Sequence, residues 1–230
     1  YINYLFKNVL GVDIKTPIRR MTYTEAMENY GSDKPDLRNP LIIHDLTSFF
    51  ADREFVEING RTIPFKNKLV RGIVAKGAAA TLTRKEIDKL TEHAKGIGAK
   101  GLAYVRWVDD APNCSFAKFM TEDELNAIYT AVELEKGDVL LICADKNKVV
   151  LPTLGALRQI VARKLDLIPT GVFNFLWITE FPFFEWNEET EHWDAMHHPF
   201  TMPLEECLPY LESDPDKVYA RCYDMVLNGT

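Results

Sequence analysis

Two adjacent histidines, His197 and His198, followed by Pro199, are the residues of this chain best suited to chemistry. Successive side chains of an extended segment point in opposite directions, so the two rings cannot face one metal ion. Two interpretations are open. One histidine faces solvent while the other makes structural hydrogen bonds, or one of them faces a substrate carboxylate, because imidazole takes up a proton near neutral pH.

Asp224 and the loop Ser32–Asp36 supply the other charged groups that could act on a substrate. Asp224 lies in an alternating segment, Tyr223–Leu227, so it either faces solvent or lies beside a cation, and the spacing alone favours solvent. A role with magnesium and phosphate needs a second carboxylate, so we expect no metal bound by this chain alone. Asp33 and Lys34 lie in a proline-containing loop, and the simplest interpretation is a turn that satisfies its own hydrogen bonds.

The composition is that of an ordinary globular protein, because 47% of the 230 residues are hydrophobic and 27% are charged. This excludes a largely disordered chain. The net charge of -7 argues against a strongly basic nucleic-acid module but not against a local basic face. The most apolar stretch, 167–184, is interrupted by prolines and polar residues, so it cannot span a bilayer. With no signal peptide and four well-separated cysteines, we expect a cytoplasmic protein with reduced thiols.

The middle of the chain, 39–170, alternates between strand and helix patterns. Three short apolar segments predict strands, at 68–75, 102–108 and 138–144. Three helices are also predicted: one that Thr83 opens with a capping box, one that Thr121 opens, and one over 154–165. We expect 149–151 to pair back on the preceding strand. The third helix is expected to turn its basic side chains outward, namely Arg158, Arg163 and Lys164.

Both ends of the chain differ in character from the middle. The spacing of apolar residues predicts helices over 1–10 and 204–211, and strands over 175–179 and 219–227. The middle is expected to be a two-layer α+β domain inserted between the outer segments. Because the chain begins at a tyrosine rather than methionine and ends within a segment typical of a folded domain, we also expect a piece of a longer protein. The predicted parts are 1–38, 39–170 and 171–230.

Six phrases, in this order, resemble those of bacterial-type aspartyl-tRNA synthetases, and together they cover nearly the whole chain. They are YGSDKPDLRNP (30–40), AKGAAATLTRKEID (75–88), GAKGLAYV (98–105), GALR (155–158), AMHHPFT (195–201) and YDMVLNG (223–229). The middle part resembles the insertion domain called GAD, which is also found in the B subunit of the tRNA-dependent amidotransferase. The outer parts resemble the class II catalytic domain, a mixed domain built on an antiparallel sheet. The resemblance thus implies an α+β fold, with a two-layer GAD domain on an antiparallel sheet between pieces of that catalytic domain.

The resemblance implies an aspartate–tRNA ligase reaction. Aspartate attacks the α-phosphate of ATP, with Mg²⁺ present, to give aspartyl-adenylate and pyrophosphate, and the adenylate then esterifies the terminal adenosine of tRNA. His197 matches the family histidine that contacts bound aspartate, and His198 matches its neighbour, which supports the loop. Asp224 matches an acid beside the magnesium–ATP site, and Asp33 and Lys34 lie in a family phrase near the active-site mouth.

The family's anticodon-binding domain and its class motifs 1, 2 and 3 have no counterpart in these residues. We therefore expect ATP, Mg²⁺ and the family's homodimer only for a complete enzyme, and expect this piece alone to be inactive. One alternative is a non-catalytic tRNA-binding module related to the amidotransferase B subunit, although the GAD domain alone would not supply AMHHPFT or YDMVLNG. Another is a metal-dependent hydrolase that uses His197 and His198. Any tRNA contact by the middle part would need a local basic patch, such as Arg71, Arg84 and Lys85.

Overall fold

A computed structural model describes residues 1–51, 55–58, 61–64 and 68–230, and its gaps fall inside the predicted 39–170 part. The described residues form two compact units. The first unit consists of Tyr1–Met27, Asp33–Leu37 and Gly171–Thr230, and the second consists of Glu28–Ser32 and Arg38–Thr170. Within the described ranges, no helix is both long enough and apolar enough to cross a membrane.

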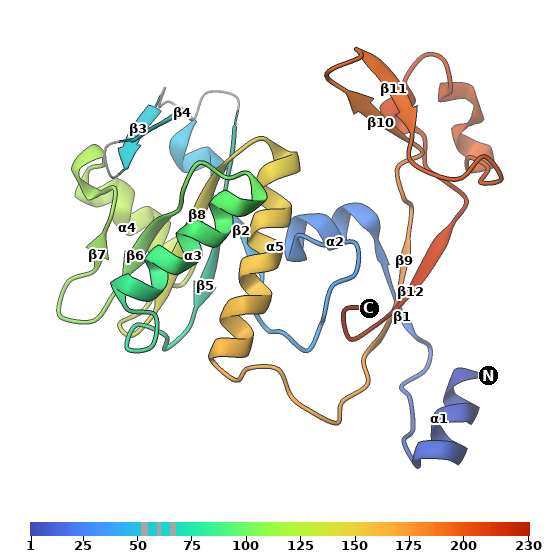
Figure 1. Cartoon of the computed structure of the whole chain (residues 1–230), viewed down its shortest axis with the longest axis horizontal. Coiled ribbons are helices and arrows are strands. Elements are labelled where there is room, and N and C mark those ends of the chain that lie inside the picture. The colour runs from blue at the N-terminus through green and yellow to red at the C-terminus, as the bar shows by residue number, and fades with distance from the viewer. Residues whose placement is uncertain (52–54, 59–60, 65–67) are drawn as a thin grey trace. The chain divides into compact units, whose positions relative to one another are not determined.

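The second unit is built on a five-stranded, wholly antiparallel sheet (Figure 1). All seven residues of its central strand β8 are buried, as expected for a strand that is covered on both faces. The order of the strands is β2 (Ile43–Asp45), β5 (Leu69–Ala75), β8 (Val139–Asp145), β6 (Ala103–Arg106) and β7 (Asn113–Cys114). A separate hairpin joins β3 (Phe55–Ile58) to β4 (Arg61–Pro64).

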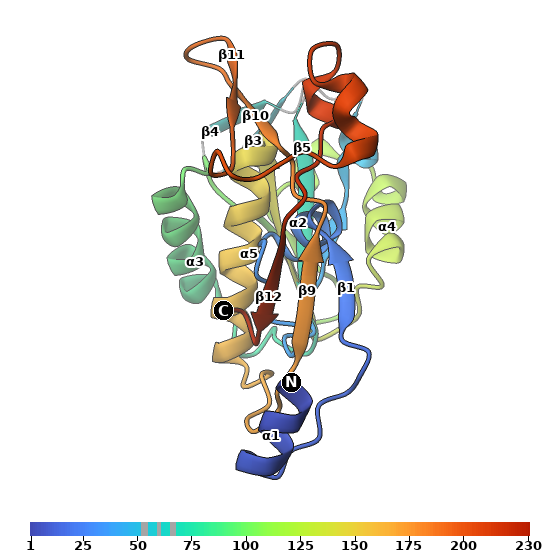
Figure 2. The same ribbon diagram turned by 90° about the vertical axis from the view of Figure 1, so that its right-hand side faces the viewer.

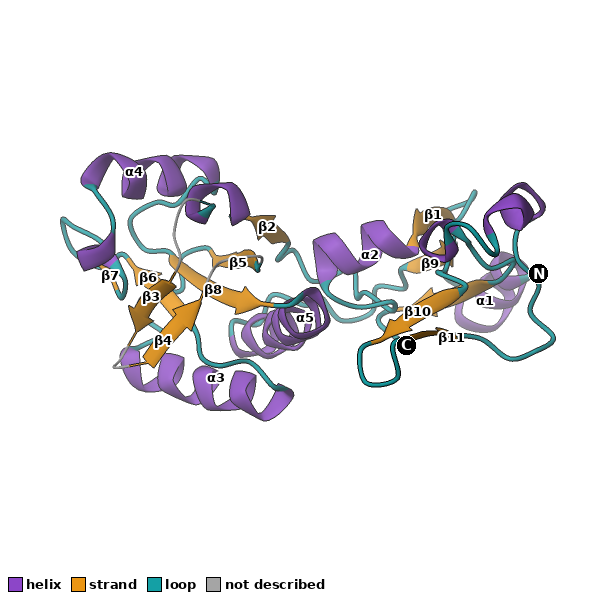
Figure 3. Ribbon diagram, turned by 90° about the horizontal axis from the view of Figure 1, so that it is seen from above, coloured by secondary structure: helices purple, strands orange, loops and turns teal. Residues whose placement is uncertain are grey.

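Helices cover both faces of this sheet (Figures 2 and 3). The helices α3 (Arg84–Ile97) and α5 (Asn147–Lys164) lie on one face, and α4 (Glu122–Ala131) lies on the other. Two short 3₁₀-helices, η1 (Thr47–Phe50) and η2 (Ala117–Phe119), border the α4 side. The predicted antiparallel α+β fold is confirmed, and α4 adds a layer to the two that were expected. The apolar cluster under α4 includes Val105, Ile128, Tyr129, Leu140 and Ile142.

The ends of two helices test the predicted caps. Thr121 forms the complete capping box of α4, because its hydroxyl accepts from the Glu124 N–H while the Glu124 carboxylate accepts from the Thr121 N–H. Thr83 is the N-cap residue of α3, yet its side chain makes no capping hydrogen bond. The prediction of a capping box was therefore wrong at Thr83.

The helix α5 corrects two further predictions. It begins at Asn147 and continues through Pro152, so the segment 149–151 is the first part of a helix rather than a paired strand. The β-branched Val150 is fully buried, which explains a strand-like pattern in a helix. Arg158 was expected on the outer face, but it is only 1% exposed, because its guanidinium binds backbone carbonyls inside the unit.

The first unit contains a three-stranded mixed sheet in which β9 (Phe175–Thr179) is the middle strand. The strand β1 (Arg19–Thr22) runs parallel to β9, whereas β12 (Tyr223–Leu227) runs antiparallel to it. A parallel pair needs a long crossover connection, and here the crossover is the chain of the second unit. One face of the sheet carries four buried side chains, those of Met21, Leu176, Ile178 and Val226.

The remaining elements surround this sheet. The helix α1 (Ile2–Leu10) packs Phe6 against Phe173 and Phe175, with ring centroids 5.1 and 5.2 Å apart. The helix α2 (Tyr23–Tyr30) begins beside Thr22, whose hydroxyl accepts from the Glu25 N–H.

The C-terminal part of the first unit begins with a hairpin of β10 (Phe184–Asn187) and β11 (His192–Ala195). The segment predicted as a helix at 204–211 is the 3₁₀-helix η3 (Glu205–Tyr210), which contains a proline. Another 3₁₀-helix, η4 (Pro215–Lys217), follows it. The strand predicted over 219–227 is regular only from Tyr223, where β12 begins.

Candidate active site

His197 lies just after β11, where it packs against the segment that leaves β9. Its Nε2 lies 3.0 Å from the carbonyl oxygen of Pro182, and its ring stands edge-on to Phe181 with centroids 5.8 Å apart. The side chain is half-buried. One ring nitrogen of His197 is therefore committed to the protein, and the other is the atom that can act on a ligand.

His198 is exposed and has a different role in the loop. Its Nδ1 lies 3.4 Å from the Phe200 N–H, and its ring packs against the Phe200 ring with centroids 4.6 Å apart. The two histidines thus divide into one that binds the core of the unit and one that faces solvent. This agrees with the interpretation in which one histidine makes structural hydrogen bonds and the other faces solvent. It also leaves Nδ1 of His197 available for a substrate carboxylate.

Tyr23, which the sequence did not single out, connects several of the candidate residues. Its ring packs against Phe181 with centroids 5.3 Å apart, and Phe181 in turn contacts His197. Burial, and then the nearby carboxylates of Asp33 and Glu185, raise the pKa of the Tyr23 phenol. Asp33 is therefore near Tyr23, and His197 contacts Phe181, the aromatic partner of Tyr23.

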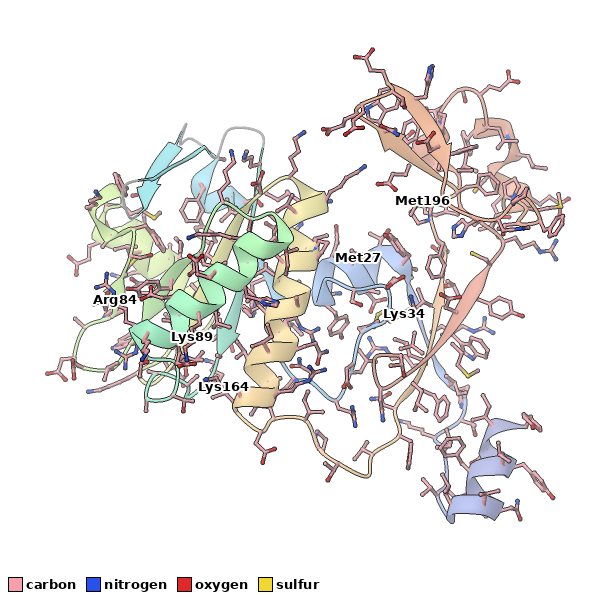
Figure 4. The ribbon with its side chains drawn as sticks, viewed as in Figure 1. Met27, Lys34, Arg84, Lys89, Lys164 and Met196 are labelled. Carbon is pink, nitrogen blue, oxygen red and sulfur yellow. The ribbon has the colours of Figure 1, made fainter. Side chains whose placement is uncertain are left out.

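The loop that carries Asp33 and Lys34 packs against the end of β12. The Lys34 Nζ lies 3.3 Å from the Asp33 carboxylate, with both side chains partly exposed (Figure 4). Asp36 is only 4% exposed. A Cβ atom built on Gly229, whose φ is +90°, would lie 3.1 Å from the Asp36 Cβ. A glycine is thus required at this turn both for the backbone angle and for the close approach.

Asp224 lies on β12 opposite Ile178 of β9 and is exposed. Burial and the negative charge of Asp224 raise the pKa of the Cys222 thiol. Within the described ranges, no hydrogen bond or ion pair joins Asp224 to His197. Asp33 and His197 thus both lie near the pair of Tyr23 and Phe181, and Asp224 lies on the strand whose end approaches Asp36.

Two cavities border the three-stranded sheet of the first unit. One has a volume of about 380 Å³, and the other about 660 Å³. The alternation of side chains along a strand separates the smaller cavity from Asp224, because Tyr223 and Asp224 point to opposite faces. The larger cavity is also lined by Met21 and Cys222. Neither cavity was predicted from the sequence, because each lining joins segments that are far apart in the chain. The smaller is lined by Arg20, Trp177, Thr179 and Tyr223.

A metal centre finds no support among the described residues, which contain no group of three or more histidine, cysteine or acidic side chains that could hold an ion. In the part of the chain that the structure covers, all four cysteines are free thiols.

Several cations of the second unit are paired with carboxylates. Arg71 lies 3.2 Å from Asp45, and its side chain is only 11% exposed, so it does not offer its charge to a partner. Lys164 of α5 and Lys89 of α3 both bind Glu86, and their hydrogen bonds lower the pKa of Glu86 to about 2 (Figure 4). Of the basic patch considered from the sequence, Arg84 and Lys85 are exposed.

Residues 64–154, which lie in the second unit, match the family model of the GAD domain. The match runs from the end of β4 into α5, and it therefore includes the central strands of the antiparallel sheet. The expected resemblance to the GAD domain is confirmed.

The whole chain is similar to bacterial aspartate–tRNA ligases. It is 49% identical to the aspartate–tRNA(Asp/Asn) ligase of Lachnoclostridium phytofermentans over 98% of the chain. It is 48% identical to the aspartate–tRNA ligase of Agathobacter rectalis over 100% of the chain, and 49% identical to that of Clostridium botulinum over 99%. The chain spans 38% of the length of each of these relatives.

Proposed function

We propose that these 230 residues are a section of an aspartate–tRNA ligase. The observation that carries the proposal is the similarity of the whole chain, at 49% identity, to a relative with that name. The proposed reaction forms aspartyl-adenylate and pyrophosphate from aspartate and ATP, with Mg²⁺, and then transfers the aspartyl group to the 3′ end of tRNA. The proposed parts are catalytic segments at 1–38 and 171–230, with a GAD domain over 39–170 between them.

In this proposal His197 contacts the carboxylate of bound aspartate. Support comes from its half-buried ring, whose Nε2 is already committed to the Pro182 carbonyl and whose Nδ1 is free for a ligand. An imidazolium that meets a carboxylate makes a charge-assisted hydrogen bond, which both binds and orients the substrate. His198 holds the following loop through Phe200.

The proposed roles of the acidic residues follow from where they lie. Asp224 works on the magnesium–ATP side, where an exposed carboxylate can share a hydrated Mg²⁺ with phosphate oxygens. Asp33 and Lys34 lie at the mouth of the site, close to the pair of Tyr23 and Phe181 that leads to His197. We further propose that the complete enzyme acts in the cytoplasm as a homodimer, as the family resemblance implies.

A non-catalytic tRNA-binding module is the second candidate, because residues 64–154 of the second unit match the GAD domain. ATP–pyrophosphate exchange separates the two candidates. The longest natural protein that contains this chain should exchange label in the presence of aspartate and of no other amino acid, whereas the isolated 230 residues should give no exchange. Exchange with a different amino acid, or none with aspartate, would overturn the ligase proposal. A module would still retard tRNA in a filter-binding assay without any exchange.

A further inference from the structure

The segment 181–183, which follows β9, is held by two other segments of the first unit. The Phe183 N–H donates to the Val218 carbonyl at 2.8 Å, and the Ala220 N–H donates to the Phe181 carbonyl at 2.7 Å. The Met196 N–H, directly after β11, donates to the Phe183 carbonyl at 3.0 Å. These hydrogen bonds leave the backbone of 181–183 few alternative conformations.

A left-handed residue turns this segment out of the strand. Glu180, directly after the last residue of β9, has a φ of +58°, which is uncommon for a residue other than glycine. In a continued strand, Phe181 would point to the same face as Thr179. The turn at Glu180 interrupts this alternation, and the Phe181 side chain is buried, with an exposed fraction of 6%. The direction of Phe181 is therefore set by the backbone at Glu180 and by the hydrogen bonds of 181–183.

Phe181 and Pro182 together restrain the imidazole of His197. The rings of Phe181 and His197 are nearly perpendicular, at 89°, with centroids 5.8 Å apart. The carbonyl oxygen of the next residue, Pro182, lies 3.0 Å from Nε2 of the same imidazole. Tyr23 packs against Phe181 with ring centroids 5.3 Å apart. Because a phenyl ring carries no donor or acceptor, its contact restrains the imidazole without occupying Nδ1.

We infer that Phe181 is a positioning residue for His197. The backbone that fixes the Phe181 ring also fixes the Pro182 carbonyl, so the two contacts hold the imidazole in one orientation and keep Nδ1 free for a ligand. A hydrogen bond to a substrate carboxylate depends on this orientation. The inference rests on the proposed ligase function for its catalytic part, and on the contacts above for its structural part.

Long-range ¹H–¹⁵N NMR spectra of the 230-residue chain test the structural part. In the neutral ring of the parent chain, Nε2 of His197 should carry the proton and Nδ1 should carry none. Phe181→Leu removes the flat ring, so the two ¹⁵N shifts of His197 should move toward each other as the imidazole samples its other tautomer. Phe173→Leu is the matched control, because Phe173 packs against Phe6 instead. It should leave the shifts of His197 unchanged.

Unchanged ¹⁵N shifts of His197 in Phe181→Leu would overturn the inference. Loss of the folded spectrum in Phe181→Leu would leave Phe181→Met to decide the outcome in the same measurement. Methionine also lacks the ring, and its flexible side chain adapts to an irregular space in a core.

The catalytic part is tested by ATP–pyrophosphate exchange in the longest natural protein that contains this chain. Phe181→Leu should raise the KM for aspartate by about three- to tenfold and leave the KM for ATP nearly unchanged, because a misoriented imidazole affects only the amino acid. Phe173→Leu should change neither constant. An unchanged KM for aspartate in Phe181→Leu would overturn the positioning role.

A double substitution separates positioning from a general structural effect. If Phe181 acts through His197, Phe181→Leu added to His197→Gln should raise the KM for aspartate by less than about twofold over His197→Gln alone. An equal rise in both backgrounds would overturn the inference. Absence of aspartate-dependent exchange in the unmodified protein would instead overturn the proposed function, and the NMR result on His197 would still stand.

Discussion

The Nε2 atom of His197 lies 3.0 Å from the carbonyl oxygen of Pro182. A carbonyl can only accept a hydrogen bond, so Nε2 carries the proton in this contact and Nδ1 is the atom left for a ligand. The neighbouring His198 makes no such contact with the core of its unit, since its partners are the Phe200 backbone and ring. This difference allows the two histidines to be separated by experiment.

Substitution of His197 by glutamine should weaken aspartate binding. Glutamine can still donate to Pro182 but cannot become a cation, so a charge-assisted bond worth about 1.5–3 kcal/mol is lost. We expect the KM for aspartate to rise by about ten- to a hundredfold in ATP–pyrophosphate exchange by the complete protein, since 1.4 kcal/mol corresponds to a factor of ten. His198→Gln is the control and should change this KM by less than about threefold. Equal effects of the two substitutions would contradict the assignment.

Asp224→Asn should affect the magnesium requirement rather than the amino acid. Removal of one negative charge beside a metal–phosphate group weakens the hold on Mg²⁺, so the Mg²⁺ concentration for half-maximal exchange should rise about tenfold. Asp216→Asn, an exposed acid in η4, serves as the control and should leave the Mg²⁺ titration unchanged. A rise in the KM for aspartate with no change in the Mg²⁺ titration would place Asp224 elsewhere in the site.

The pair of Lys68 and Asp145 should stabilise the second unit in a pH-dependent way. The two atoms lie 2.9 Å apart, with side-chain exposures of 14% and 10%. Burial alone would raise the pKa of Asp145, but the hydrogen bonds from Lys68 and the Lys146 N–H, with the Lys68 charge, leave it lowered. A lowered pKa in the folded state means that the stabilisation is present above the unfolded value of about 3.9 and is lost as the pH falls through the folded value.

Lys68→Met should therefore destabilise the second unit by about 1–3 kcal/mol at pH 7, and the difference from the parent chain should shrink toward pH 3. The measurement is urea denaturation at several pH values. Lys136→Met removes an exposed pair with Asp110, and its cost should be no more than about 1 kcal/mol. A difference that stays constant between pH 7 and pH 3 would refute the linkage.

The two helix caps offer a matched pair of substitutions. Thr121→Ala should lower the free energy of unfolding by about 1 kcal/mol, because it removes the hydroxyl that accepts from the Glu124 N–H, while the Thr121 N–H can still donate to the Glu124 carboxylate. Thr83→Ala should lower the free energy of unfolding by only a few tenths of about 1 kcal/mol, because the Thr83 side chain makes no capping hydrogen bond. Thermal denaturation of the chain, followed by circular dichroism, measures both. A larger loss of stability for Thr83→Ala would contradict the cap geometry.

The four thiols should differ in reactivity. Burial raises the pKa of Cys143 to about 12 and that of Cys114 to about 11, so both are almost entirely protonated in neutral solution. Cys207 is 5% exposed, whereas Cys222 is half-buried. Iodoacetamide at about pH 8 should label Cys222 first and Cys143 and Cys207 only after unfolding, as followed by peptide mass spectrometry. Early labelling of Cys143 in the folded chain would contradict the structure.

The regular elements of the second unit could be predicted from the sequence, because apolar periodicity and local caps decide them. The strand predicted at 68–75 is β5, and the capping residues around Thr121 begin a helix as expected. The segment 149–151 was misread for a physical reason. A fully buried helix and a fully buried strand both show an unbroken apolar run, and β-branched residues favour the wrong choice.

The candidate site was less predictable, because its contacts join segments that are far apart in the chain. His197 and Asp33 were found through their chemical types, but Tyr23 lies in a plain amphipathic helix and carries no local signal. Arg158 was assigned to the surface because a charged residue on a helix usually faces solvent. Only the fold shows that three backbone carbonyls converge on it.

The pairing of β1 with β9 has a consequence for the order in which this chain folds. Arg19 pairs with Leu176, so during synthesis β1 must wait until β5, β8 and α5 have all been made. The intervening residues contain their own core and can collapse as a unit while β1 is still without its neighbour. The first unit can therefore be completed only late in synthesis, and premature release of the nascent chain before Tyr223 would leave an edge of β9 without its partner and open to association with other copies.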